Sequence, residues 1–249
     1  MRPRAAGVAM VFGWLTERRR KRLLEEPWPA AWDGHIEENV ALVRRLDEAE
    51  RQRLRELVQV FIAEKHWEGC GGFEMTEEVQ VTVSAQACFL LLGREHALYE
   101  DVESILVYPG VMKTPDGDVI LGQAHMKGPT ILAWNDVLQG GRGKGKRNLV
   151  FHEFAHQIDM VDGTVDGTPP LEDRADLRTW AVVCSEVFLE LQDKVEDGKR
   201  TFLDEYGATN EAEFFAVATE AYFMQPAKLE SVHPELFAVL LDFYRFDPR

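Results

Sequence analysis

The sequence predicts an α+β fold in which helices flank one small mixed sheet. Apolar residues recur at helical spacing in the first hundred residues and again after residue 147, whereas residues 103–134 hold short β-rich runs bounded by Pro or Gly. These patterns are grouped along the chain and do not alternate as β-α-β, which argues against a doubly wound parallel sheet. With 249 residues, of which 45% are hydrophobic, the chain is long enough to bury a large core.

The first hundred residues have the pattern of helices. Asp47 and Glu50 resemble a capping box at a helix start. A one-sided apolar stripe follows and comprises Leu54, Leu57, Val58, Phe61 and Ile62. Thr76 is a candidate N-cap for a second helix, which runs to about Leu92 and is stopped by Gly93.

The rest of the chain predicts the sheet and a second group of helices. Three β-rich runs predict strands at 105–108, 119–121 and 130–134. Four apolar-periodic stretches predict helices at 147–161, 173–193, 210–224 and 233–245.

We expect two parts along the chain. Residues 1–22 form a basic, flexible N-terminal segment whose true start is Met1 or Met10, and its apolar stretch lacks the small-residue cleavage site of a signal peptide. Residues 23–249 form a single domain, helical to about residue 100, with the sheet and the later helices over 101–249.

Charge and cysteine usage exclude several classes of protein. The chain carries 28 basic and 43 acidic residues, and residues 150–249 alone hold 8 basic against 21 acidic ones. Such a field repels nucleic acid, and the basic run at 18–22 is short enough to be a solvated helix end. No apolar run has the length of a membrane span. Three scattered cysteines without a Cys-x-x-Cys pair indicate a reducing compartment, so we expect a cytoplasmic protein.

The strongest chemical signal is a His-Glu-x-x-His motif at residues 152–156. Residues four apart lie one above the other on a helix, so His152 and His156 present two imidazoles to one metal ion, with Glu153 beside it. The surrounding segment is apolar almost all round, and burying these groups without a partner is costly. The alternative, two core histidines hydrogen-bonded to carboxylates such as Asp159, does not account for the position of Glu153.

A third protein ligand remains to be found. The other histidines form no matching pair, and the His-x-x-Gly-x-x-His extension of the metzincins is absent. Glu213 and Glu220 lie in the apolar helix predicted at 210–224 and are the candidates. From the residues alone, Glu213 is equally explained as the third residue of a capping box that begins at Asn210.

Other motifs indicate no further cofactor site. Residues 140–146 approach a phosphate-binding loop, but Arg147 replaces the Ser or Thr that holds magnesium. Residues 162–167 resemble the start of a calcium loop, but prolines at 169 and 170 interrupt it. We predict a loop that caps or gates the cleft at the first place and a turn-rich loop at the second.

Two further stretches complete a pattern that is specific to one known family. The metal motif and its continuation at 152–160 are followed by residues 166–169 and by residues 206–217. Together they resemble the Mlc titration factor A family of zinc peptidases, and the likeness covers nearly the whole chain. The resemblance implies a zincin-like metallopeptidase domain, similar in its core to lethal-factor-type toxin proteases, with one Zn²⁺ per chain.

The resemblance also assigns roles to individual residues. In that family the third ligand is the Glu that stands seven residues after a Tyr, and Tyr206 and Glu213 have this spacing. It therefore implies that His152, His156 and Glu213 bind the zinc ion, and it favours Glu213 over Glu220, the other candidate from the residues. It further implies that Tyr206 assists catalysis.

Zinc chemistry then predicts a mechanism. Three protein ligands leave a fourth position for a water molecule, whose pKa zinc lowers to about 7. Glu153 takes the proton of this water and delivers it to the leaving amine, while Tyr206 donates a hydrogen bond to the oxyanion. Asp159 is a candidate to orient an imidazole, with a salt bridge at the helix end as the alternative. The strand at 130–134 is expected to be an exposed edge to which an extended peptide adds, an interior strand being the alternative.

Two hypotheses of function follow. The first is a zinc-dependent, aminopeptidase-like peptidase that acts on peptides or proteins and, by resemblance, takes part in the regulation of sugar uptake. The second is a binding protein that sequesters a transcriptional repressor of the Mlc type, with zinc mainly structural. The presence of Glu153 favours the enzyme, because a structural site usually closes its fourth position with another Cys or His.

Overall fold

The computed structural model describes residues 16–110, 112–113, 119–120, 122–124, 128–171 and 173–249. The two candidate starts, Met1 and Met10, and residue 121 of the predicted second strand lie outside the described residues. Residues 16–25 are helical, and Arg20 Nε lies 2.8 Å from Glu64 Oε1. The described part of the basic N-terminal segment is therefore a helix that is paired with the rest of the chain.

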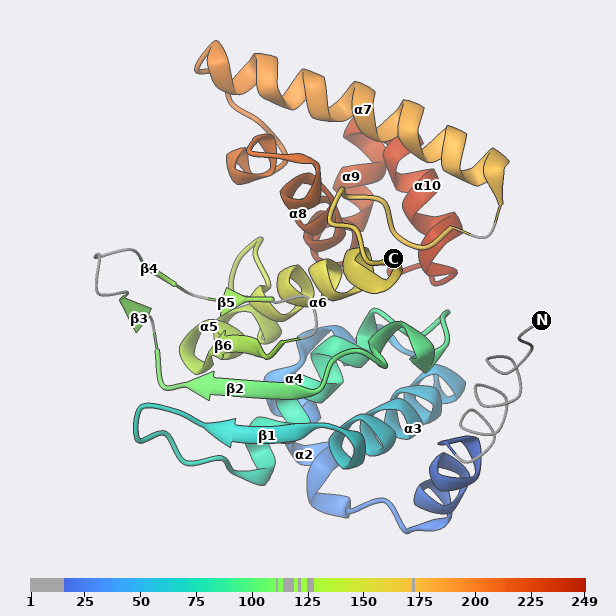
Figure 1. The fold of residues 1–249 in the computed structure, drawn as a ribbon, viewed down its shortest axis with the longest axis vertical. Coiled ribbons are helices and arrows are strands. Elements are labelled where there is room, and N and C mark those ends of the chain that lie inside the picture. Colours follow the sequence, from blue (N-terminus) through green and yellow to red (C-terminus); the bar gives the residue numbers. More distant parts are fainter. Residues whose placement is uncertain (1–15, 111, 114–118, 121, 125–127, 172) are drawn as a thin grey trace, which may run out of the picture.

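Helices predominate around a small sheet (Figure 1), and the α+β prediction is confirmed. The α-helices are α2 (Ala30–Asn39), α3 (Glu48–Glu64), α4 (Glu77–Phe89), α5 (Trp134–Gly141), α6 (Leu149–Asp159), α7 (Arg174–Glu196), α8 (Glu211–Met224), α9 (Pro226–Val232) and α10 (Pro234–Tyr244). The 3₁₀ helices are η1 (Ala41–Arg45), η2 (His96–Tyr99), η3 (Met160–Asp162) and η4 (Glu205–Ala208). The strands are β1 (His66–Gly69), β2 (Ser104–Tyr108), β3 (Met112–Lys113), β4 (Val119–Ile120), β5 (Gly122–Gln123) and β6 (Thr130–Ala133).

The main sheet has the strand order β1-β2-β6-β5. Strands β1, β2 and β6 are parallel, whereas β5 runs antiparallel to β6 and places Gly122 opposite Leu132. Strands β3 and β4 form a separate antiparallel pair. The described sheet is thus mixed, and its edge strand next to β6 is β5.

The preference for an exposed edge at 130–134 is wrong. Strand β6 lies between β2 and β5 and pairs with both of them, so it is the interior strand that was the alternative. The sequence does not reveal this, because the strand that covers β6 has only two residues and so carries no period-two pattern. Residue Trp134, expected in the strand, is the first residue of α5.

The N-terminal helices follow their predicted start signals. The Asp47 side chain accepts a hydrogen bond from the Glu50 N–H at 2.8 Å, and the Glu50 carboxylate accepts one from the Asp47 N–H at 2.8 Å, so the capping box is confirmed. Thr76 caps α4 as predicted, but α4 ends at Phe89, before Leu92. Strand β1 was not predicted, since Trp67 is the one apolar residue among its four and no β-rich run marks it.

The four helices predicted after the sheet agree with α6, α7, α8 and α10 to within three residues, whereas α5 and α9 were missed. Pro226 and Pro234 are the first residues of α9 and α10, the position at which proline is tolerated in a helix. Within the part of the chain that the structure describes, no helix has the combination of length and apolar character that a membrane crossing requires.

Helix α6 lies at the centre of the molecule, between the sheet on one side and α8 on the other (Figure 1). Two fully buried aromatic rings fix it in place. The Phe151 ring lies 5.3 Å from that of Phe223 on α8, and the Phe154 ring lies 5.7 Å from that of Phe61 on α3. Burial of such rings dominates the packing energy, so the rotation of α6 about its axis is set by its apolar side. The opposite side, with the two histidines, faces the cleft described below.

Candidate metal centre

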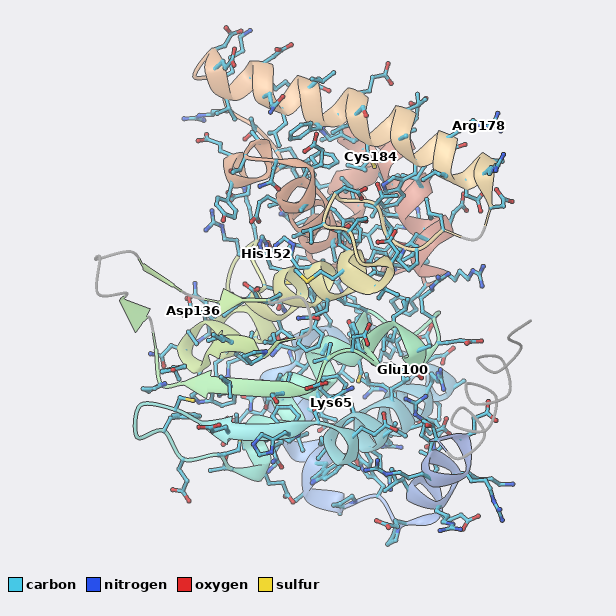
Figure 2. All side chains as sticks on the ribbon, viewed as in Figure 1. Lys65, Glu100, Asp136, His152, Arg178 and Cys184 are labelled. Atoms are coloured by element: carbon cyan, nitrogen blue, oxygen red, sulfur yellow. The ribbon has the colours of Figure 1, made fainter. Side chains whose placement is uncertain are left out.

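Helix α6 presents His152 and His156 one turn apart. Asn148 is the N-cap of the helix, and its side chain accepts a hydrogen bond from the Phe151 N–H at 3.0 Å. The two imidazole ring centroids are 4.9 Å apart, and both side chains are mostly buried. Figure 2 shows His152 on α6, in the region between α8 and the sheet.

Glu213 reaches the two histidines from the first turn of α8. Its Oε2 atom lies 3.0 Å from His152 Nε2 and 3.4 Å from His156 Nε2. The backbone N–H of Glu213 donates to Asn210 Oδ1 at 2.9 Å, so Asn210 does cap the helix. The capping role that the sequence left open thus applies to the backbone of Glu213, while its carboxylate is directed at the histidines.

The geometry of this group suits a metal ion. Among the residues described, it is the one set of three His, Cys, Asp or Glu side chains whose ligand atoms all lie within 4.8 Å of one another. Neighbouring ligand atoms of a tetrahedral zinc ion with bonds of about 2.1 Å lie about 3.4 Å apart. The two measured nitrogen-to-oxygen distances, 3.0 and 3.4 Å, are close to this value. Two imidazole nitrogens and one carboxylate oxygen are also a donor set that zinc accepts.

The carboxylates around His152 and His156 stabilise a positive charge at this group. Burial lowers the pKa of His152, but hydrogen bonds with Glu213 and Glu220 outweigh it and raise the pKa to about 10. Burial raises the pKa of Glu213, but hydrogen bonds with His152 and His156 outweigh it and hold the pKa well below its usual value. A proton on His152 therefore offsets the surrounding carboxylates, and a bound cation can replace it.

Glu153 lies in the wall of the same cleft and is 5% exposed. Burial raises the pKa of its carboxyl group to about 7, against the opposing effect of His152 and His156. A carboxylate with a pKa near neutrality is suited to accept a proton and to release it again.

Gly122 is a residue of this site that the sequence analysis missed. A Cβ atom added to Gly122 on β5 would lie 2.4 Å from Glu153 Oε1 and 2.6 Å from Leu149 Cδ1. A side chain at this position is therefore incompatible with the observed place of the Glu153 carboxylate. The available signal was a glycine inside a β-rich stretch, which often marks the close approach of another group.

Tyr206 comes from the 3₁₀ helix η4 and is 52% exposed. Its hydroxyl donates a hydrogen bond to Glu213 Oε1 at 3.2 Å, and its ring centroid lies 6.1 Å from that of His152. Asp204 holds the start of η4, because its Oδ1 accepts from the Tyr206 N–H at 3.0 Å and its Oδ2 lies 2.6 Å from Arg147 Nη2. The phenol is thereby held at the mouth of the cleft.

Glu220 and Asp159 lie outside the three-residue group. Glu220 Oε1 lies 2.9 Å from His152 Nδ1, the ring nitrogen that faces away from Glu213. Asp159 Oδ2 accepts from the Gly167 N–H at 3.0 Å, while Asp159 Oδ1 and His156 Nδ1 are buried without a hydrogen-bond partner among the described residues. The predicted hydrogen bond between Asp159 and an imidazole is therefore not present.

The three-residue group, Glu153 and Tyr206 line a cleft of about 920 Å³ between α6, α8, η4 and β5. The volume is within the range of substrate-binding clefts. Its wall includes Gly122, His152, Glu153, His156, Tyr206 and Glu213. The cleft gives a bound ion access to molecules from solution, as a catalytic metal centre requires and a closed structural site does not.

A His-Glu-x-x-His helix packed against a small mixed sheet, joined by a glutamate from a later helix, defines the zincin-like metallopeptidase fold. Residues 14–245 match the model of the glucose-regulated metallo-peptidase M90 family, and the chain belongs to that family. It is 34% identical to an uncharacterized protein of Synechocystis, over 97% of this chain and 94% of the relative. It is 28% identical to the Mlc titration factor A of Salmonella agona and of Salmonella typhimurium, over 90% of this chain and 88% of each relative. The resemblance recognised in the motifs is thereby confirmed.

Proposed function

We propose that this chain is a zinc-dependent, aminopeptidase-like enzyme that hydrolyses peptide bonds. One observation carries the proposal: ligand atoms of His152, His156 and Glu213 lie within 4.8 Å of one another in an open cleft that Glu153 also lines. In this proposal the first three residues hold the zinc ion. When bound, zinc supplies a water molecule with a pKa of about 7 and polarises the substrate carbonyl.

The protein side chains supply the proton transfers. The Glu153 carboxylate accepts a proton from the attacking water, and the resulting carboxylic acid delivers it to the leaving amine. Its pKa of about 7 makes both steps accessible at neutral pH. The Tyr206 hydroxyl turns from Glu213 Oε1 to the oxyanion that develops on the substrate carbonyl, and so stabilises the transition state.

An extended peptide binds along β5 in this proposal. One side of β5 pairs with β6, and in the described sheet its other side has no strand partner. The free backbone groups of such an edge accept a further strand. Carboxylates of Asp136 and Glu211 also line the cleft and suit the free amino group of a peptide, which supports aminopeptidase-like cleavage.

The deciding experiment is hydrolysis of a mixed peptide library with free and with acetylated amino termini. We expect the zinc-loaded protein to cleave peptides with free amino termini, the chelator-treated protein to cleave none, and added Zn²⁺ to restore cleavage. Cleavage of both sets would leave a peptidase but refute the aminopeptidase-like specificity. No cleavage by protein that holds one zinc ion per chain would refute the enzymatic proposal.

The name of the Salmonella relatives favours a second function. In this alternative the chain sequesters a transcriptional repressor of the Mlc type in the cytoplasm, takes part in the regulation of sugar uptake, and uses zinc mainly for structure. Repressor binding that is unchanged in Glu153→Gln, by protein that cleaves no peptide, would favour this alternative.

Tyr206→Phe is expected to lower kcat about 10²-fold, because one donor to the oxyanion is lost. More than half of the Tyr206 side chain is exposed, so its removal should leave the melting temperature and the zinc content unchanged. The measurement is steady-state hydrolysis, and a kcat within twofold of the wild-type value would remove Tyr206 from the mechanism.

Gly122→Ala is expected to lower hydrolysis about 10²-fold, because its Cβ displaces the Glu153 carboxylate by a distance that matters for proton transfer. Gly34→Ala is the matched control, since an added Cβ at Gly34 meets nothing within 4 Å. Zinc content should stay at the wild-type level in both variants. Equal hydrolysis by the two variants would show that Gly122 does not position Glu153.

A further inference from the structure

The carboxylate of Glu220 joins α8 to two parts of α6. Its Oε1 atom lies 2.9 Å from His152 Nδ1, and its Oε2 atom accepts a hydrogen bond from the Asn148 N–H at 2.5 Å. Glu220 is 6% exposed, its contact with Asn148 is buried, and its contact with His152 is partly buried. A buried carboxylate is costly unless its oxygens are satisfied, and here each oxygen has a partner on α6.

The position of Glu220 excludes it from the three-residue metal group. The Nε2 atom of His152 faces Glu213, and Glu220 contacts the other nitrogen of the same ring. When Nε2 of a histidine binds a metal, Nδ1 carries the hydrogen and needs an acceptor. Glu220 is that acceptor for His152, whereas His156 Nδ1 has no hydrogen-bond partner among the residues described.

The second contact explains why Glu220 is held firmly. The Asn148 N–H belongs to the N-terminus of α6, where unpaired N–H groups and the helix dipole favour a negative charge. Asn148 itself is anchored, because its side-chain amide donates to Gln86 Oε1 on α4 at 2.9 Å. Glu220 therefore links the His152 ring to Asn148, which is itself hydrogen-bonded to α4.

We propose that Glu220 is a positioning residue, which orients the His152 ring and holds the hydrogen on Nδ1, so that Nε2 is the nitrogen that gives up its proton to the metal ion. The inference rests on the proposed metal centre and adds to it a group that is not a ligand. Glu213 and Glu220 are seven residues apart on α8, so one helix supplies a carboxylate to each nitrogen of one imidazole.

The test measures zinc affinity by competition with a chromophoric chelator. Glu220→Ala is expected to bind zinc about 10- to 100-fold more weakly than the wild type, the usual effect of losing such a partner. Glu220→Gln should also weaken binding, since its amide cannot accept from both Asn148 and His152. Glu220→Asp, which keeps the carboxylate, should recover part of the affinity. Glu235→Gln, an exposed glutamate at the start of α10, is the control and should bind zinc as the wild type does.

A second readout separates positioning from general stability. In the zinc-loaded wild type, ¹⁵N-histidine NMR should show the Nδ1 hydrogen of His152 as a protected, hydrogen-bonded resonance, and Glu220→Gln should lose that protection while its circular dichroism stays native. Wild-type affinity together with an unchanged resonance in Glu220→Gln would overturn the inference. If Glu220→Ala fails to fold, the test rests on the zinc affinity and the NMR resonance of Glu220→Gln, which keeps the side-chain volume. A wild-type protein that binds no zinc would instead refute the proposed function.

Discussion

Glu153→Gln is expected to abolish most peptide hydrolysis, with a decrease of about 10²- to 10⁴-fold in kcat, while zinc binding stays at the wild-type level. The substitution keeps the shape of the side chain, so its fit beside Gly122 on β5 is preserved. It removes the group that accepts and releases the proton. The zinc-loaded variant should bind peptide with a normal KM, and steady-state kinetics at matched zinc content measure the effect.

Glu186→Gln provides the matched control for this prediction. Glu186 is exposed on α7, and the cleft is lined by other residues. We expect its hydrolysis to equal that of the wild type. A Glu153→Gln variant that retains more than a tenth of the wild-type kcat would exclude Glu153 as the general base.

Glu213→Ala is expected to remove the metal ion. Its Oε2 atom is the only one of the three grouped ligand atoms that α8 supplies, and two histidines alone leave the site short of the three protein ligands of a catalytic zinc. The loss of affinity should exceed the about 10- to 100-fold loss expected for a partner outside the ligand set, such as Glu220. Metal analysis after dialysis, and chelator competition where an ion remains, measure the difference.

Glu211→Ala is a close control for this variant, because Glu211 stands two residues earlier in the first turn of α8 and is exposed. It should keep one zinc ion per chain. The zinc affinities of the variants distinguish the two carboxylates of α8. If Glu220→Ala loses more zinc affinity than Glu213→Ala, then Glu220 is the ligand and Glu213 is not, which reverses the roles proposed for them.

The local features of the site were open to sequence reasoning because they depend on neighbours in the chain. Four-residue spacing on a helix brings His152 and His156 to one side, whatever the rest of the fold does. The capping box at Asp47 and the cap at Thr76 are likewise contacts over three residues, and the structure has both. Glu213 was a candidate beside Glu220 from the residues, and the family resemblance favoured Glu213 and added Tyr206, both at least fifty residues from the histidines.

The contacts between distant segments were not open to sequence reasoning. Glu213 and Glu220 lie on the same side of α8, two turns apart, and only the packing of α8 against α6 decides which ring nitrogen of His152 each carboxylate reaches. The order of the strands is a similar case. The short strand β5 carries no pattern of its own, so its place beside β6 was missed, and with it the close contact of Gly122 with Glu153.

The sequence by itself determined the family, the α+β class and the helix that carries the metal motif, since periodicity, caps and motif spacing act within a few residues. Only the tertiary structure decided three features. These are which strand forms the edge of the sheet, the space that Gly122 leaves for the Glu153 carboxylate, and which nitrogen of His152 each of Glu213 and Glu220 contacts. The physical reason is that these features depend on side-chain packing between segments far apart in the chain. The rotation of α6, set by Phe151 and Phe154 against helices on either side, is what brings them together.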